Sequence, residues 1–514
     1  MKQKMYFVLL ISTIAALPLL TWALFGPPRL VVKPEAASHL DELLEQWALD
    51  GTISGSVLIA QDGVVFLNEG YGLADRAQGI PNTPGTRFHL ASLSKSFTAM
   101  AILILQSQGR LNVQDPICNH MVRCSEAWQG ITIHQLLTHT SGLSPRLHDI
   151  VSKAARKPEA PPDPGYYIEI AGEVPLETRP GEQYDYNNFG YTLLAHIIEQ
   201  ASGQSYADFL DKNIFTPLNM RDSGYEDSSS GGALGYSYRY DTTGAEYEQW
   251  PISDGEGQLY STTGDLYLWD QALYTDQLLP QAELETMFER YVPQTIDVPG
   301  FGWGYGVLVT KLLGRPVIAG AGGSGYHSTF WLRYPADGLT LIVLMNQGDI
   351  DHMSVLLAIA GALFLSDLVF LVSALAFNLL LAILFVAQKN EWTRAVRGIG
   401  IMWLLLAIPL AFVFARYLAE GMGLPILVSL ALVLLYMLVE FLLDFVFKVE
   451  FRQNWKTHVP YIVLEYIALF SLIRLAFNIH PTYGYAVSIT FWILLAALIY
   501  LFWDKIRMWK RKEP

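Results

Sequence analysis

The last third of this 514-residue chain constrains its fold most strongly, because it is almost continuously apolar. From Ser366 onward most residues are Leu, Ala, Ile, Val or Phe. Five stretches are close to the ~20 residues that a helix needs to cross a bilayer. We therefore expect an all-α bundle of five transmembrane helices within residues 361–514, at residues 367–387, 397–418, 424–447, 459–479 and 484–503.

The connections between these stretches alternate in charge. "QKNEWTRAVR", "FKVEFRQNWKTH" and the tail "DKIRMWKRKEP" are basic, whereas "LAEGMGLP" and "NIHPTYG" contain no Lys or Arg. Basic connections face the cytoplasm in most membrane proteins. The alternation predicts a multi-pass cell-membrane protein in which residues 28–360 lie outside the cytosol, in a periplasmic or extracellular space. A buried helical bundle of a soluble protein would not require this pattern.

The N-terminus carries a second membrane signal. "MKQKMYFVLLISTIAALPLLTWALFGPP" has a basic start followed by about 20 apolar residues, which is enough to span a bilayer. Residues 1–27 are therefore either an uncleaved anchor or a cleaved signal peptide. The length of the apolar stretch and the lack of a clean A-x-A site favour the anchor. Both chain termini are then cytoplasmic, and in either case the following residues are exported.

The exported region is acidic. Residues 30–365 contain 18 Lys and Arg against 39 Asp and Glu, a net charge of −21. Such a charge argues against nucleic acid as a partner, because phosphate binding needs a basic surface. The partners expected are instead the lipid bilayer and a small-molecule or cell-wall substrate. The histidines show no metal-ligand spacing, so we predict no metal and no cofactor.

The chain has two cysteines, Cys118 and Cys124, in "ICNHMVRC". In the cytosol they would be two thiols or a poor metal pair. In an oxidising compartment we expect them to form a disulfide. A loop this short should stabilise the fold less than a longer one.

Two β-hairpins bracket the exported region. "GSVLIA-QDG-VVFLNEGYG" joins two β-rich runs through Asp-Gly, and "STFWLRY-PADG-LTLIVLMNQ" repeats the pattern near residue 340. Helical patterns lie between them. The order predicts an α+β fold, with an antiparallel sheet flanked by helices, closed by both ends of the region and carrying an inserted helical lobe.

"ASLSKSFTAM" places Ser92 and Lys95 three residues apart at the head of an apolar helix. Both side chains then share one helix face. Burial favours the neutral form of the amine, and a neutral lysine activates a neighbouring serine hydroxyl. The helix N-terminus would stabilise an oxyanion. A lone Ser-x-x-Lys also arises by chance, so further motifs must support it.

Two further motifs follow. "PGEQYDYNNFGYTLLAHIIEQASG" places Tyr186 and Asn188 on a loop before a helix, where a phenol could relay a proton and an amide could hold a substrate carbonyl. The alternative is a capping loop with a surface tyrosine. "ITIHQLLTHTSGL" predicts a helix with a Thr132/Gln135 capping box that ends at Gly142. We expect its histidines to serve structure rather than catalysis.

Together, "FHLASLSKSFTAMAILILQSQGRLNVQDPI", "ITIHQLLTHTSGL" and "PGEQYDYNNFGYTLLAHIIEQASG" resemble the serine β-lactamase-related family, which includes class C β-lactamases, D-alanyl-D-alanine carboxypeptidases and related esterases. The resemblance covers roughly residues 36–350 and implies a β-lactamase/transpeptidase-like fold. It implies that Ser92 is acylated, Lys95 is its base and Tyr186 joins the proton relay. It also implies that Asn188 binds the substrate amide.

The third motif of this family departs from its pattern. The resemblance implies a substrate-binding edge strand in "AGAGGSGYHS", here assigned to Gly322, Gly323 and Ser324. The family places Lys-Thr-Gly or His-x-Gly before "GYxS", but "VIAGAGGSG" has no basic residue. Ala319 or Gly320 occupies that position, depending on a one-residue gap. Side-chain alternation along a strand argues against His327 as a replacement. Carboxylate-terminated substrates are therefore disfavoured.

These observations predict a membrane-bound serine hydrolase that acts through an acyl-serine on an amide or ester, such as a cell-wall peptide, a D-amino-acid ester or a β-lactam-like compound. One alternative is a catalytically weak cell-wall or β-lactam-binding sensor. Another is a transporter, because spans with ionisable residues are candidates for function; we expect these residues to serve helix packing instead. An α/β-hydrolase is excluded because no G-x-S-x-G occurs. The ionisable residues are Glu440, Asp444, Glu465 and Arg474.

Overall fold

The structure is a computed structural model, and the residues it describes form two compact units. One unit is Asp41–Leu356, and the other combines the described residues of Met1–Leu40 with those of Leu357–Pro514. The predicted anchor or signal at residues 1–27 lies outside the described residues, which are 30–155, 164–225, 231–237, 241–244, 255–292, 300–312, 315–348, 350, 352–448 and 455–510.

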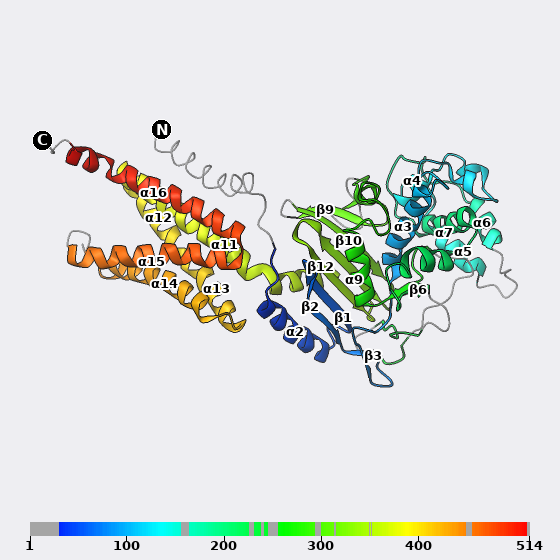
Figure 1. Ribbon diagram of the computed structural model, residues 1–514, viewed down its shortest axis with the longest axis horizontal. Coiled ribbons are helices and arrows are strands. Elements are labelled where there is room, and N and C mark those ends of the chain that lie inside the picture. The colour runs from blue at the N-terminus through cyan, green and yellow to red at the C-terminus, as the bar shows by residue number, and fades with distance from the viewer. Residues whose placement is uncertain are drawn as a thin grey trace. The chain divides into compact units, whose positions relative to one another are not determined.

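A seven-stranded antiparallel sheet forms the centre of the first unit (Figure 1). Its strand order is β2-β1-β12-β11-β10-β9-β8. The first and last long strands of the region pair directly, Gly55 opposite Met345, so both ends of the region close one sheet as predicted. The strands are β1 (Gly55–Gln61), β2 (Val64–Tyr71), β8 (Gly302–Trp303), β9 (Leu308–Leu312), β10 (Arg315–Gly323), β11 (Ser328–Tyr334) and β12 (Leu339–Met345).

Both predicted hairpins are present. Asp62 and Gly63 link β1 to β2 with φ values of +52° and +80°, as a type I′ turn requires. Gly338, at φ +61°, links β11 to β12 after a short 3₁₀ turn. Local turn chemistry therefore fixes the register of both strand pairs.

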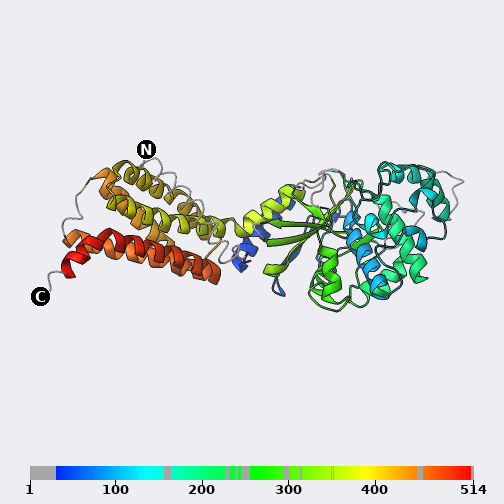
Figure 2. The same cartoon turned by 90° about the horizontal axis from the view of Figure 1, so that it is seen from above.

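Helices cover the sheet and form the inserted lobe. Figure 2 shows the lobe helices gathered together at the end of the unit away from the β-hairpin β1–β2. Figure 1 shows α9 lying across the sheet, where Trp331 of β11 donates to Asp270 at 2.9 Å. The helices are α3 (Lys95–Ser107), α4 (Ile133–Leu137), α5 (Leu147–Ala155), α6 (Pro164–Gly172), α7 (Asn188–Ser202), α8 (Tyr206–Leu210), α9 (Thr263–Ala272) and α10 (Gln281–Leu284).

Short strands and a disulfide complete this unit. Cys118 and Cys124 are joined by a disulfide, with their Cα atoms 5.4 Å apart. Two small sheets consist of β3 (Leu73–Asp75) with β4 (Ile80–Pro81), and of β5 (Phe88–His89), β7 (Leu259–Ser261) and β6 (Gly224–Tyr225).

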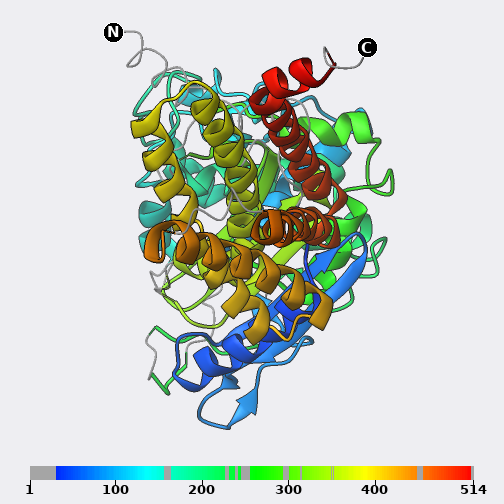
Figure 3. The same ribbon diagram turned by 90° about the vertical axis from the view of Figure 1, so that its left-hand side faces the viewer.

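The second unit is helical, and Figure 3 shows its long helices in yellow, orange and red. Five stretches are long and apolar enough to cross a membrane, as predicted: Ser354–Lys389, Thr393–Ala419, Leu424–Val446, His458–Ile479 and Pro481–Trp503. The helices are α11 (His352–Lys389), α12 (Thr393–Leu405), α13 (Ala407–Ala419), α14 (Leu424–Phe441), α15 (Trp455–Ile479) and α16 (Pro481–Lys510), and α14 continues into a π-helical turn, Leu442–Val446.

The first of these helices is longer than predicted. The prediction began at residue 367, but α11 begins at His352 and has 38 residues. At 1.5 Å per residue it is about 57 Å long, nearly twice the ~30 Å hydrocarbon core. It is therefore longer than one membrane crossing would require, and the predicted domain boundary at residue 360 falls inside one continuous helix.

A buried polar cluster ties the segment before residue 40 to this helical unit. Lys33 forms an ion pair with Asp367 of α11, and the Tyr417 hydroxyl donates to the same carboxylate at 2.6 Å. The Lys33 ammonium also lies 4.8 Å from the centre of the Tyr417 ring. A charge at Asp367 within an apolar helix is thus compensated by a cation and a phenol.

Candidate active site

Ser92 lies in a strained turn between a strand and a buried helix. After β5, the 3₁₀ turn Ala91–Ser94 runs directly into α3 at Lys95. Ala91 has φ +47°, a left-handed conformation that side chains rarely adopt. Such strain is common next to functional groups, because the surrounding structure must hold it. Here it precedes the half-buried Ser92 and the fully buried Lys95.

The structure brings Ser92, Lys95 and Tyr186 together. Lys95 Nζ donates to Ser92 Oγ at 3.0 Å, and the Tyr186 hydroxyl donates to the same oxygen at 2.9 Å. Lys95 Nζ also donates to the backbone carbonyl of Glu256 at 2.9 Å. The serine oxygen therefore lies within hydrogen-bonding distance of an amine and a phenol, two groups through which its proton could be exchanged, as an activated nucleophile requires.

His139 holds the tyrosine loop against Lys95. Its ring packs against that of Tyr186 at an angle of 34° with centroids 4.4 Å apart, and its Nδ1 accepts from the Asn187 N–H at 3.1 Å. Burial, reinforced by the charge of Lys95, lowers the pKa of His139 well below 6.5. The imidazole is therefore neutral, and its contacts hold the loop that carries Tyr186.

His139 also explains an error in the predicted helix. The Thr132/Gln135 capping box is present, but α4 ends at Leu137 instead of Gly142. His139 has φ +55°, which a helix cannot contain. The chain leaves the helix there and brings the imidazole onto the tyrosine loop.

Asn187 and Asn188, which follow Tyr186, differ in the hydrogen bonds that their side chains make. Asn187 is buried and caps α7: its side chain accepts from Gly190 N–H and donates to the carbonyls of Leu143 and Ser144. Asn188 begins α7, and its amide oxygen bonds to no polar atom of the described residues. Of the two side-chain oxygens, that of Asn188 is therefore the one not engaged within the described residues.

The edge of β10 packs on the turn that holds Ser92. A Cβ at Gly322 would meet the carbonyl oxygen of Leu90 at 2.1 Å, so this position requires glycine. Strand β9 pairs with β10 over Arg315–Ala319, which leaves the edge beyond Ala319 without a strand from the described residues. Ser324 N–H is bonded to the His327 carbonyl at 2.9 Å, whereas Gly323 is exposed.

The structure also distinguishes the two positions at which this chain could lack the family's basic residue. Gly320 and Gly322 share one face of β10, and a Cβ at Gly320 would point at Leu93, the residue after Ser92. Ala319 lies on the opposite face, so Gly320 is the position that faces the site. His327 does not replace the cation, because burial, with the neighbouring His89, lowers its pKa to about 3.

Other residues of the site were not predicted. Glu256 contacts Lys95 through its backbone carbonyl, and its carboxylate lies 3.0 Å from His148 Nδ1. Gly306, at φ +68°, packs on the Lys95 carbonyl, which a Cβ would approach to 2.3 Å. A backbone contact across 161 residues leaves no side-chain pattern in the sequence, so no motif could have revealed it.

Comparisons with known proteins agree with this geometry. The family model described as Beta-lactamase matches residues 40–363. Penicillin-binding protein 4* of Bacillus subtilis is 31% identical over 353 residues, covering 62% of this chain and 73% of that protein. Of two further curated relatives, the chain covers 61% and 48% of their length.

Solved structures share the fold. A penicillin binding protein from Bacillus halodurans aligns with a TM-score of 0.54 and 27% identity, covering 61% of this chain and 98% of that one. A D-stereospecific amidohydrolase from Streptomyces sp. aligns with a TM-score of 0.51 and 22% identity, covering 65% and 98%, and shows a similar fold alone.

A Ser-x-x-Lys turn packed between an antiparallel sheet and a helical lobe, with a phenol on the serine oxygen, defines a class of serine acyl-transfer proteins. The chain belongs to the Beta-lactamase family of serine hydrolases and is related to penicillin-binding proteins. The matched region ends at residue 363, inside α11, so the family model does not cover the rest of that helix or the apolar helices after it.

Proposed function

We propose that this protein is a membrane-bound serine hydrolase that acts outside the cytosol through an acyl-serine intermediate on an amide or ester. The observation that carries the proposal is the pair of contacts to Ser92 Oγ, 3.0 Å from Lys95 Nζ and 2.9 Å from the Tyr186 hydroxyl. Lys95 is fully buried, and its Nζ also donates to the Glu256 carbonyl, so the amine is held beside the serine.

In the proposed mechanism, Lys95 acts as the base and takes the proton of Ser92 as Oγ attacks the substrate carbonyl. The backbone N–H groups of Ser92 and Gly323 stabilise the oxyanion, and Asn188 holds the substrate amide. Tyr186 and Lys95 return the proton to the leaving amine or alkoxide. Water then attacks the acyl-serine, and its proton passes back through the same two groups.

Gly320 supports a substrate without a terminal carboxylate. The position that faces the Ser92 turn has no side chain, and buried His327 is neutral, so neither supplies a cation. A charge-assisted hydrogen bond to a substrate carboxylate is therefore missing on this strand. Within the substrates considered, esters and amides that lack that group fit better than penicillins or cell-wall peptides that end in D-alanine.

The proposed placement is a domain at residues 28–360 outside the cytosol, an anchor or signal at 1–27, and five spans within residues 361–514. Basic connections at one end of the helices support this orientation, with both termini inside if the anchor is retained. The disulfide between Cys118 and Cys124 also supports an oxidising compartment.

A second candidate, a catalytically weak sensor of cell-wall fragments or β-lactams, is favoured by the same departure at Gly320. Labelling of the full-length protein with a fluorophosphonate and with a fluorescent penicillin separates the two. A reactive hydrolase with ester preference should react with the fluorophosphonate and poorly with the penicillin. Reaction with neither reagent would favour the sensor and contradict the hydrolase.

A further inference from the structure

The helical unit encloses a cavity that the hydrolase function does not use. Its volume is about 770 Å³, and it is lined by α11, α12, α14, α15 and α16. Its lining reaches Gln388 near the end of α11, Arg397 near the start of α12 and Lys448 just beyond α14. All three adjoin the basic connections, so the cavity lies at the end of the helices predicted to face the cytoplasm. Ligand pockets usually measure about 300–1,000 Å³.

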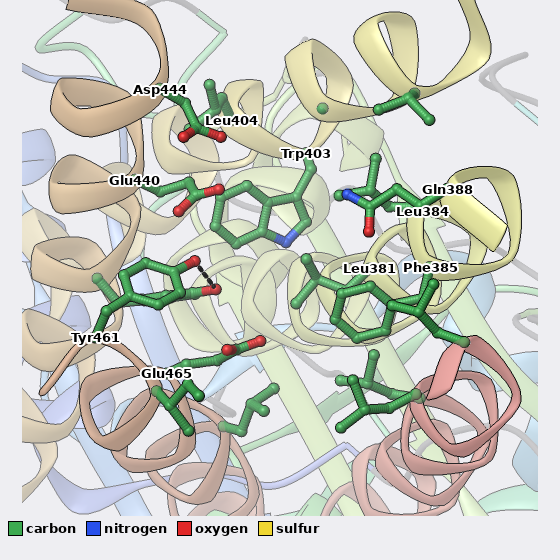
Figure 4. Close-up of a pocket in the computed structure, with 18 of the residues that line it drawn as sticks. Leu381, Leu384, Phe385, Gln388, Trp403, Leu404, Glu440, Asp444, Tyr461 and Glu465 are labelled. Atoms are coloured by element: carbon green, nitrogen blue, oxygen red, sulfur yellow. Dashed lines mark hydrogen bonds between the residues drawn. The ribbon is translucent and has the colours of Figure 1, made fainter. Parts of the chain in front are cut away.

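The interior of the cavity is acidic and aromatic. Figure 4 shows Glu440, Tyr461 and Glu465 along one side, and Leu381 and other apolar side chains on the other. The Tyr461 hydroxyl lies 3.0 Å from that of Tyr436. The two glutamates are half-buried and come from different helices, α14 and α15.

Both glutamates lie at similar depth in the predicted spans. Glu440 is six residues from the end of Leu424–Val446, and Glu465 is seven residues from the start of His458–Ile479, which places each about 10 Å inside. Carboxylates at such depth are rare and are candidates for function.

Trp403 provides an independent sign of a ligand. It is only 2% exposed, and its Nε1 bonds to no polar atom among the described residues. Figure 4 shows the indole nitrogen facing the space between the glutamates and the apolar side. The ring packs against Tyr436 with centroids 5.6 Å apart. A buried N–H donor without an acceptor is costly, so it points to an acceptor that the protein itself does not supply.

We propose that this cavity binds an organic cation, an ammonium or phosphonium ion with apolar substituents. The carboxylates of Glu440 and Glu465 would neutralise its charge, and the rings of Tyr436 and Tyr461 would stabilise it through cation–π contacts. The apolar side would accommodate its substituents, and Trp403 N–H would donate to an acceptor carried by the natural ligand. The site is separate from Ser92 and does not depend on the proposed hydrolase activity.

The test measures binding of tritiated tetraphenylphosphonium to the full-length protein in phosphatidylcholine nanodiscs. Saturable binding near one per chain is expected, with little competition from the neutral triphenylmethanol. Glu440→Gln and Glu465→Gln should each weaken it by about tenfold or more, since each removes one charge while keeping the shape. Glu391→Gln, an exposed acid in the connection at the same end, should bind like the wild type.

Two glycines of α12 provide a matched steric pair. A Cβ at Gly400, which lines the cavity, and one at Gly398, which does not, would each meet no atom within 4 Å. Gly400→Leu should therefore block binding, and Gly398→Leu should not. Monodisperse elution and an unchanged midpoint of thermal unfolding show that each variant is folded. Binding no greater than to empty nanodiscs, or binding unchanged in Glu440→Gln, Glu465→Gln and Gly400→Leu, would overturn the proposal.

Discussion

The side-chain nitrogen of Lys95 lies 3.0 Å from the hydroxyl oxygen of Ser92, and Lys95 is completely buried. Replacing this lysine tests its role as a base. Lys95→Met keeps much of the apolar volume and removes the amine, so acylation by an activated ester should slow by about 10²–10⁴-fold. Ser96→Ala, one residue further along the same buried helix, is the matched control. Equal rates for Lys95→Met and the control would remove Lys95 from the mechanism.

Tyr186 should contribute less than Lys95, because the amine and the phenol both contact Ser92 Oγ. Tyr186→Phe keeps the ring on His139 and removes the hydroxyl. We expect a loss of about 10²-fold in the acylation rate with unchanged thermal stability. Stopped-flow acylation rates measure the first quantity, and thermal unfolding measures the second. A wild-type acylation rate would show that Tyr186 contributes packing but no proton transfer.

Gly320 should determine how the site treats a substrate carboxylate. Gly320→Lys should raise acylation by penicillin roughly tenfold more than acylation by a neutral ester, since one charge-assisted hydrogen bond is worth that much. Gly320→Ala controls for crowding of Leu93, and Ala321→Lys places the same charge on the other face of β10. Equal changes with both substrates would show that the position does not sense charge.

The orientation of the helices can be tested with single cysteines, because both native cysteines lie in the disulfide. Gly423→Cys lies in the connection predicted to be external and Asn390→Cys in one predicted to be cytoplasmic, and both positions are exposed. On intact cells, a membrane-impermeant maleimide should label the first and spare the second. The reverse pattern would invert the topology.

The His148–Glu256 pair should make stability depend on pH. Burial opposes a charge on His148, but the hydrogen bond and charge of Glu256 outweigh it, so the pKa of His148 is raised above 6.5. Its stabilising contribution is then complete below the unfolded value and declines as pH rises through the folded pKa. His148→Gln should lower the free energy of unfolding by up to about 1 kcal/mol near pH 5 and by less near pH 9. Urea pulse proteolysis of the full-length protein measures this gap, and a gap that widens with pH would contradict the assignment.

Features with local causes could be predicted from the sequence. The turn residues predicted both hairpins, and the lengths of the apolar stretches predicted the five long apolar helices. The Ser-x-x-Lys spacing predicted that Ser92 lies beside Lys95. Features with long-range causes could not. The left-handed backbone conformation of His139 ends a helix whose sequence pattern continues to Gly142. The backbone carbonyl of Glu256 accepts from Lys95 although it lies far from Lys95 in the sequence.

The helical unit shows the same limit. Glu440 and Glu465 were expected to serve helix packing, because a single span gives no information about which side chains of neighbouring spans share a space. Only the packing of α14 against α15 and α12 brings both glutamates and Trp403 to one cavity. The rotation of one helix relative to another depends on tertiary contacts rather than on residue periodicity.

Intact-mass analysis of the full-length protein after reaction with a fluorophosphonate tests most directly whether Ser92 is the nucleophile. The wild type and the Ser96→Ala control should gain the mass of one phosphonyl group, and peptide mapping should place it on Ser92. Ser92→Ala should gain none. Monodisperse elution and thermal unfolding show that this variant is folded. A single adduct of equal extent on Ser92→Ala would contradict the assignment of the active site.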